Sequence, residues 1–282
     1  MNIGKFPLLC TLLLATACSG SDDNDGADGG TTGAADAADA VSSCAETPTR
    51  LIVLGDSIAA CFGVNGKDAA TCGPKIFNDS LAAGYAPGLV YENLAVSGAV
   101  TTDVVDSQLA TVTTGSAGHA VVLIYVGGND LQRYLLQGDA AAEAGLAADL
   151  PGIIADWNSV FAFFNDTANF PDGTTIIMNN QYNPFDDCTA PPYNLSATKS
   201  ALLSSYNVEL ATLADSQENA FITDQYGPYL GHGHHYNVNS CPHYQAGLEP
   251  FMEDLIHPNI AGHAHLATQW DVMADSLYGD CE

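Results

Sequence analysis

The amino-acid sequence predicts an α/β fold, in which a parallel sheet is covered by helices on both faces. Short apolar runs that are typical of buried strands recur along the chain. Between these runs, apolar residues are spaced as they are on one face of a helix. The 282 residues suffice for one α/β domain with a large core, or at most for two small domains. Alternation of strand and helix implies parallel strands joined by crossover connections.

Five segments have the composition of strands. The first is the clearest, because Leu51–Leu54 is continuously apolar and a glycine follows it directly. A continuous apolar run indicates a strand that is buried on both faces, whereas a half-exposed strand alternates. The predicted strands are Leu51–Leu54, Val90–Leu94, Val121–Val126, Thr174–Met178 and Ala220–Thr223.

Three later segments have the periodicity of amphipathic helices, and we interpret their apolar stripes as core. The inward-facing residues are Ile153, Ile154, Trp157, Val160, Phe161 and Phe164 in the first helix, Leu202, Leu203, Tyr206, Leu210 and Leu213 in the second, and Leu266, Trp270, Met273 and Leu277 in the last, which begins at about Asn259. Residues 131–150, which are rich in Ala, Gly and Asp, are predicted to form a loop or a helix near the functional site.

Residues 181–250 exceed what an ordinary connection needs, and we interpret them as a long late insertion. Its stretches 181–194 and 227–250 are rich in polar, Gly and Pro residues. Long ordered loops are often functional, so we expect substrate selection in this region.

The first 18 residues resemble an export signal. Lys5 supplies a positive charge, and Leu8–Leu14 forms an apolar core that is too short for a permanent membrane span. Ala15-Thr-Ala-Cys18 resembles the lipobox of bacterial lipoproteins, in which the cysteine is lipidated and becomes the new N-terminus. Plain secretion with another cleavage site is the alternative. We expect an exported protein, with a lipid anchor on Cys18 if the lipobox is used.

Residues 19–43 are mostly Ser, Asp, Gly, Ala and Thr, and they contain hardly any large apolar side chain. Such a segment cannot bury enough surface to fold, so we expect a disordered linker. The folded domain is therefore predicted to comprise residues 44–282, and we expect it to be a monomer.

Six cysteines remain in the predicted domain, and an even number in an exported chain suggests disulfides. Their spacing leaves several pairings open. We favour Cys61–Cys72 as a local loop, Cys188–Cys241 as a staple across the insertion, and Cys44–Cys281 as a tie between the two ends.

The charge balance limits the partners. There are 33 acidic residues against 6 Lys and Arg, which gives a formal net charge of −27. A surface of this sign repels phosphate backbones, so the composition argues against nucleic-acid binding and disfavours anionic lipid.

Polar residues follow three of the predicted strands. Gly55-Asp-Ser57 follows the first strand directly, Gly98 comes shortly after the second, and Gly127-Gly-Asn129-Asp130 follows the third. Ligands of open α/β sheets bind at the carboxyl ends of the strands. A serine there can act as a nucleophile, and backbone N–H groups with an Asn amide can bind an oxyanion. Taken singly, Ser57 is equally well explained as a helix cap, and the Gly and Asn residues as turns.

A histidine and a carboxylate occur near the C-terminus. Asp254 and His257 are three residues apart, a spacing that puts both side chains on one face of a helix or tight turn. A carboxylate can hold one imidazole nitrogen protonated and leave the other free to accept a proton. By itself, this pair is a weak signal.

Together the four stretches resemble, in order and placement, the SGNH (GDSL-type) serine esterase and lipase family. The resemblance covers about residues 48–280. It implies a flavodoxin-like three-layer α/β/α fold and a carboxylic ester hydrolase that needs no metal or other cofactor. Ile58, which stands where the family usually has Leu, is a mild departure.

The resemblance also implies a role for each matching residue. Ser57 is the nucleophile, His257 is its general base, and Asp254 orients His257. The backbone N–H groups of Ser57 and Gly98 form an oxyanion hole with the Asn129 side chain. The substrate is expected to be a small-molecule, glycan or lipid ester, with its acyl chain length left open.

Two other functions are also compatible with the sequence. One is a non-catalytic surface module that binds a glycan or another partner on the same fold. The other is metal binding through His232, His234 and His235, with His243 nearby, because clustered histidines can bind Zn or Cu. We favour a structural role for these histidines. His263 and His265 are interpreted as helix residues near the site, without an assigned role.

Overall fold

A computed structural model describes residues 45–191, 193 and 195–279 of the chain. Its centre is a five-stranded parallel sheet with the strand order β2-β1-β3-β4-β5, which is the flavodoxin-like order. The strands are β1 (Arg50–Gly55), β2 (Val90–Asn93), β3 (Ala120–Tyr125), β4 (Thr174–Asn179) and β5 (Ala220–Thr223). The predicted fold class is confirmed, and each predicted strand is present with ends shifted by at most one residue.

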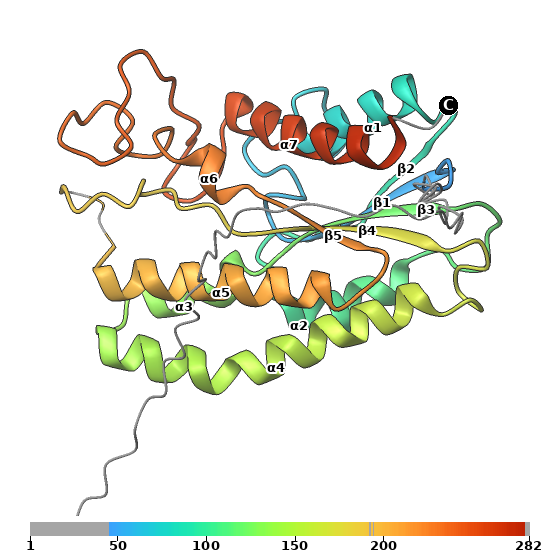
Figure 1. Ribbon diagram of the computed structural model, residues 1–282, viewed down its shortest axis with the longest axis horizontal. Helices are drawn as coiled ribbons and strands as arrows, with labels where there is room; N and C mark the ends of the chain where they lie inside the picture. Colours follow the sequence, from blue (N-terminus) through green and yellow to red (C-terminus); the bar gives the residue numbers. More distant parts are fainter. Residues whose placement is uncertain (1–44, 192, 194, 280–282) are drawn as a thin grey trace, which may run out of the picture. The chain divides into compact units, whose positions relative to one another are not determined.

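Helices cover both faces of the sheet (Figure 1). One face carries α1 (Gly73–Gly84) and α7 (Ile260–Tyr278), which pack against each other. The helices on the other face are α2 (Thr101–Asp103), α3 (Gly128–Leu135), α4 (Asp139–Asn165) and α5 (Ala197–Asp215). Three short elements complete the described chain, namely a π-helical turn at Val104–Gln108, a 3-10 turn at Leu109–Thr111 and α6 (Tyr226–Tyr229).

The core is divided by the sheet into two layers. Successive side chains of β1 alternate between them, with Leu51 and Val53 facing α1 and α7, and Ile52 and Leu54 facing α4 and α5. This alternation is the period of two that a strand imposes. Because both faces are covered, every residue of β1 and β3 is buried, which explains the unbroken apolar runs in the sequence.

The predicted helices are confirmed. Residues 131–150, predicted as a loop or a helix, comprise the end of α3, a short non-helical connection at 136–138 and the first part of α4. Helix α1 was not among the predicted elements; Pro74 occupies its first turn, where a missing N–H costs nothing. The last helix begins where expected, because the Asn259 side chain accepts a hydrogen bond from the Gly262 N–H and caps α7.

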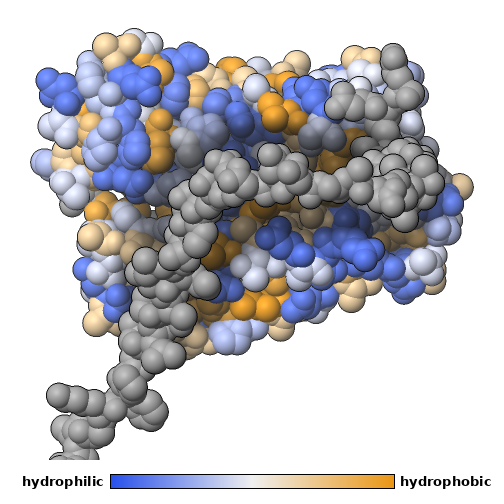
Figure 2. All heavy atoms as spheres, viewed as in Figure 1, coloured by the Kyte–Doolittle hydropathy of each residue, from blue (hydrophilic) through white to orange (hydrophobic). Residues whose placement is uncertain are grey.

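Residues 181–250 combine regular and irregular structure. They contain α5, β5 and α6, while the segments before α5 and after α6 run as loops. The Cys188–Cys241 disulfide joins these two loops, and Cys61–Cys72 closes a loop before α1. Both predicted pairings are confirmed. On the face seen in Figure 2, the loops after α6, at the upper left, carry mostly hydrophilic side chains.

The predicted signal (1–18), the linker (19–43) and the Cys44–Cys281 pairing lie outside the described residues. Within the part of the chain that the structure describes, no helix has both the length and the apolar character that crossing a membrane requires.

Candidate active site

Ser57 lies at the carboxyl end of β1, where the chain leaves the sheet. Gly55 has φ +132°, and a Cβ at this position would lie 1.9 Å from the Tyr125 carbonyl oxygen on β3. Only glycine permits so close an approach. The Asp56 N–H donates to the same carbonyl at 2.9 Å, so the turn begins with the strand still bonded to its neighbour. Ser57 follows directly and is only 7% exposed.

His257 is carried by a tight loop between the last irregular segment and α7. Met252 and Pro258 form an antiparallel bridge across the base of this loop, and the Glu253 N–H donates to the His257 carbonyl at 2.8 Å. Asn259, the cap of α7, fixes the point at which the loop ends. The loop is therefore held at both ends by backbone contacts, and its tip presents Asp254 and His257.

The structure brings Ser57, His257 and Asp254 into one hydrogen-bonded chain. His257 Nδ1 lies 2.8 Å from Asp254 Oδ2, and His257 Nε2 lies 3.0 Å from Ser57 Oγ. Because the carboxylate can only accept, Nδ1 carries the proton and Nε2 is free to accept the proton of the serine hydroxyl. This arrangement can activate a serine for nucleophilic attack.

The Asp254 carboxylate is held in its charged form. Partial burial acts to raise the pKa of Asp254, but hydrogen bonds from the Ile256 N–H and from the His257 ring and backbone outweigh it. The pKa of Asp254 therefore lies below its ordinary value. Donation of the Ile256 and His257 N–H groups to Oδ1, at 3.0 and 2.9 Å, also orients the carboxylate toward the imidazole.

The three donors expected at the oxyanion hole each keep a hydrogen without an acceptor in the part of the chain that the structure describes. Among the described residues, the backbone N–H groups of Ser57 and Gly98 have no hydrogen-bond acceptor. Asn129 lines the same pocket as Ser57, and its Nδ2 donates one hydrogen to the Ala99 carbonyl at 2.9 Å. The second amide hydrogen remains available. Gly98 does not line this pocket, but its neighbour Ala99 is thereby tied to Asn129.

Two buried carboxyl groups, those of Asp56 and Asp130, belong to these segments. The sequence predicted no catalytic role for either. Asp130 is 1% exposed, and its Oδ2 accepts from the Thr101 N–H and hydroxyl at 3.0 and 3.1 Å, which fixes the chain after Gly98. Asp56 is also 1% exposed. Burial, partly opposed by a hydrogen bond from the Ile58 N–H and reinforced by the Asp130 charge, raises the pKa of Asp56 to about 7.

Ser57 and His257 line a pocket with about 840 Å³ of empty space, part of which is open to solvent. Its walls come from the first turns of α3 and α5, from the start of the 181–194 stretch and from the His257 loop. The apolar lining residues are Ile58, Leu131, Tyr134, Tyr182, Pro184, Phe185, Leu195, Leu202, Leu203 and Ile256. No residue of the 227–250 stretch lines this pocket, so only the first half of the insertion reaches it.

The histidines considered as metal ligands do not converge. His232 Nδ1 contacts the Glu249 carbonyl at 2.8 Å, and His234 Nε2 contacts the Leu255 carbonyl at 3.0 Å. Both ring nitrogens of His235 contact carbonyl oxygens. These contacts stabilise the loops, which agrees with the structural role that we favoured.

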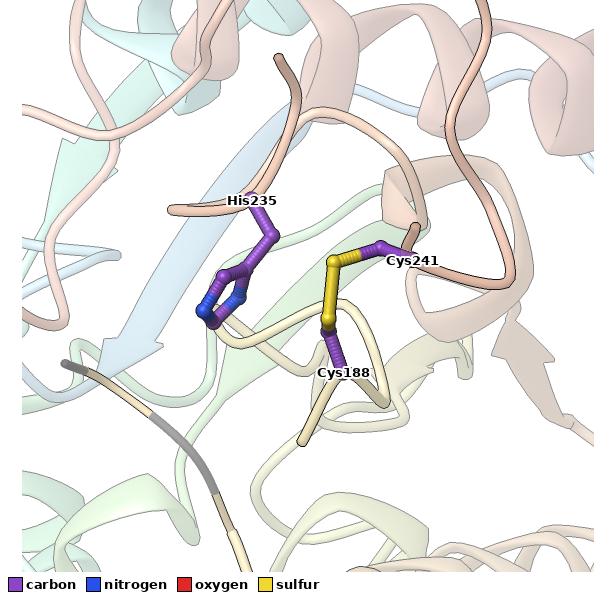
Figure 3. Close-up of side chains that lie close together, drawn as sticks. All are labelled: Cys188, His235 and Cys241. Carbon is purple, nitrogen blue, oxygen red and sulfur yellow. A yellow bond between two sulfur atoms is a disulfide. The ribbon is translucent and has the colours of Figure 1, made fainter. Parts of the chain in front are cut away.

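Figure 3 shows the His235 ring beside the Cys188–Cys241 disulfide. Among the described residues, these three are the one group of three or more His, Cys, Asp or Glu residues whose potential ligand atoms all lie within 4.8 Å of one another. The two sulfur atoms are bonded to each other and so cannot serve as thiolate ligands.

His263 and His265 lie in α7, as expected. Burial, followed by the nearby His257, lowers the pKa of His263 to about 4. Its Nδ1 accepts from the Gly73 N–H at 3.3 Å, which links α7 to the start of α1. Burial also lowers the pKa of His265.

The raised pKa of Asp56 predicts a dependence of stability on pH. An unfolded Asp loses its proton near pH 4, whereas folded Asp56 keeps its proton to about pH 7. The folded state therefore binds the extra proton in this window, and stability falls as pH rises through it. Asp56→Asn removes this loss, so the stability of the variant relative to wild type should rise by on the order of 4 kcal/mol between pH 4 and 8. Urea unfolding at several pH values measures it.

The control for this experiment is Asp106→Asn, a change at an exposed carboxylate. Surface substitutions of this kind usually change stability by less than about 0.5 kcal/mol. A stability difference between Asp56→Asn and wild type that does not vary with pH would show that Asp56 is not held protonated.

Known proteins resemble this chain in sequence pattern and in fold. The profile of the GDSL-like lipase/acylhydrolase family matches residues 53–265. Among curated proteins, none matches the chain in sequence.

Solved structures show the same fold. An extracellular lipase from Streptomyces rimosus superimposes with a TM-score of 0.56 at 21% identity, over 79% of this chain and 99% of that one. A phospholipase A1 from Streptomyces albidoflavus NA297 has a TM-score of 0.56 at 18% identity, over 80% and 99%. An acetylxylan esterase from Geobacillus stearothermophilus has a TM-score of 0.50 at 17% identity, over 80% and 93%. With the family profile covering most of the domain, the chain belongs to the GDSL-like lipase/acylhydrolase family.

Proposed function

We propose that the protein is an exported serine hydrolase that cleaves carboxylic esters through an acyl-enzyme. The observation that carries this proposal is the hydrogen-bonded chain from Asp254 through His257 to Ser57, which ends at the mouth of an apolar pocket. Membership of the family supports the same reaction class.

In the first half of the reaction, Ser57 Oγ attacks the ester carbonyl carbon while His257 Nε2 takes the hydroxyl proton. The tetrahedral intermediate carries a negative charge on the former carbonyl oxygen. Its collapse breaks the bond to the alcohol oxygen, and His257 returns its proton to that oxygen. The alcohol leaves, and the acyl group remains on Ser57.

In the second half, water attacks the acyl carbon while His257 Nε2 takes a proton from it. Collapse of the second tetrahedral intermediate breaks the bond to Oγ, which regains a proton from His257. The carboxylic acid leaves. Asp254 remains ionised throughout and stabilises the imidazolium that forms twice in each cycle.

We assign the oxyanion hole to the Ser57 and Gly98 N–H groups and the Asn129 amide. The two N–H groups have no acceptor among the described residues, and one Asn129 hydrogen is uncommitted. Donors placed in advance stabilise the developing charge without reorganisation, and loss of one costs about 3–4 kcal/mol of transition-state stabilisation.

Substitution of the proposed groups tests the mechanism. Ser57→Ala should lower kcat/KM for a p-nitrophenyl ester by at least about 10⁴-fold, because no nucleophile remains. Asn129→Ala should lower kcat by about 10²–10³-fold. A fluorophosphonate probe should label wild type and leave Ser57→Ala unlabelled.

Ser159→Ala, at an exposed position of α4, serves as the control and should match wild type. A protein that is well folded, inert toward a range of esters and unreactive with the probe would instead favour the non-catalytic binding module.

We assign the apolar pocket to the acyl chain of the substrate. The structural neighbours include a lipase, a phospholipase A1 and an acetylxylan esterase, so the fold alone does not choose among ester classes. The pocket walls carry ten apolar side chains, and each CH₂ group buried against such a surface contributes about 0.8 kcal/mol. This lining favours an acyl chain of several carbons over an acetyl group.

A narrower pocket should change the preferred chain length. Leu202 lines the pocket from α5, so Leu202→Trp should lower kcat/KM for an octanoate ester by about tenfold or more and leave the acetate ester nearly unaffected. Initial rates on p-nitrophenyl esters from acetate to octanoate measure the change.

Val208→Trp provides the matched control, because Val208 lies on the same helix but is 61% exposed and does not line the pocket. If Leu202→Trp slows acetate and octanoate hydrolysis equally, the pocket does not hold the acyl chain.

Export and lipidation complete the proposal. The two disulfides support an oxidising compartment, and the lipobox-like sequence before Cys18 suggests an anchor. In a bacterial host, Cys18→Ala should release the protein from the membrane fraction, as followed by fractionation and immunoblotting. Equal membrane association of wild type and variant would exclude an anchor on Cys18, and retention of both in the cytoplasm would exclude export.

A further inference from the structure

Phe62 covers the imidazole of His257. The two ring centroids lie 4.4 Å apart, with an angle of 37° between the planes. Phe62 is 48% exposed, although burial of an aromatic ring is favourable and other Phe residues of the chain lie in the core. Its exposed position therefore needs an explanation. The residue that Phe62 contacts there, His257, is the proposed general base.

The backbone of Phe62 is anchored to the proposed nucleophile. Its N–H donates to the Ser57 carbonyl at 2.9 Å. Cys61, the preceding residue, has φ 60°, a left-handed conformation that is unfavourable for a non-glycine residue. Its disulfide to Cys72, in a buried cluster with Val64, holds this turn. The strained turn directs Phe62 outward, over His257.

The segment also lies against the His257 loop. A Cβ at Gly63 would be 3.5 Å from Cγ of Glu253, the residue before Asp254. Beneath these contacts, His263 lies close to both His257 and the Phe62 backbone. Burial keeps His263 neutral at ordinary pH, so it adds no positive charge where the His257 imidazolium forms.

We infer that Phe62 is a positioning residue that holds the His257 ring between Asp254 and Ser57. This inference rests on the proposed function. His257 must keep Nε2 directed at the reacting oxygen in both halves of the reaction, and its side chain is 15% exposed, so packing from the solvent side limits rotation. The aromatic face, within about 6 Å, also favours the transient imidazolium.

An alternative role for an exposed aromatic ring beside the proposed general base is contact with the alcohol part of the ester. The two roles differ in the second half of the reaction. The alcohol has left before the acyl-enzyme is hydrolysed, whereas His257 must still activate water. A positioning residue therefore affects formation and hydrolysis of the acyl-enzyme, and an alcohol contact affects formation alone.

The test compares Phe62→Ala with Phe62→Tyr and with Tyr244→Ala, an exposed aromatic (37%) that does not line the pocket. Rapid-quench mass spectrometry of p-nitrophenyl butyrate turnover follows formation and decay of acyl-Ser57. Phe62→Ala should slow both steps about tenfold or more, while Phe62→Tyr and Tyr244→Ala stay near wild type. If thermal unfolding shows that Phe62→Ala is not folded, Phe62→Val, which shortens the side chain and removes the aromatic face, takes its place with the same expected result.

An unchanged decay rate of acyl-Ser57 in a folded Phe62→Ala protein overturns the inference, whatever happens to the formation rate. If the proposed function itself is wrong, the result differs. No acyl-Ser57 then forms in wild type, and Ser57→Ala has the same ester-hydrolysing activity as wild type.

Discussion

The site depends first on the contact between Gly55 and the Tyr125 carbonyl. A side chain at position 55 would collide with β3, and relief of that collision would push the end of β1 away from the sheet. The contact lets the chain leave the sheet while Asp56 still bonds to its neighbour. Ser57 thus has a defined position relative to β3, from which α3 and Asn129 follow directly. The proposed nucleophile and the proposed oxyanion donors are thus placed by adjacent strands of the buried sheet.

Two carboxyl groups near Ser57 differ in environment and therefore in charge. Asp254 lies in an exposed loop, receives several hydrogen bonds and is ionised, as its partnership with His257 requires. Asp56 is buried directly beside Ser57, and burial favours its neutral form up to about pH 7. A negative charge in that position would oppose a developing oxyanion. Below about pH 7, the fold keeps Asp254 charged and Asp56 neutral through differences in solvent access and hydrogen bonding.

The sequence was most informative where one physical effect dominated. Continuous apolar runs marked the strands because both faces of the sheet are covered, and Asn259 marked the start of α7 because its side chain caps the helix. Helix α1 was missed because its start lies among Cys, Gly and Pro residues that also suit a loop. The contact of Phe62 with His257 joins positions that are far apart in the sequence, and no local pattern indicates it. An alternating pattern could not identify Asp130 as buried either, because carboxylates are usually exposed.

The pocket walls show how core patterns can become functional. In a parallel sheet, each crossover helix begins beside the carboxyl ends of the strands, where the preceding strand stops. The first turns of α5 therefore extend past the sheet, and Leu202 and Leu203 line the pocket, whereas Leu210 and Leu213, further along the same stripe, pack in the core. Helix α3 behaves likewise, with Asn129 supplying a donor and Leu131 an apolar wall. Leu131 and Leu202 also pack against the core cluster, so one apolar stripe serves the core along most of its length and the pocket wall at its start.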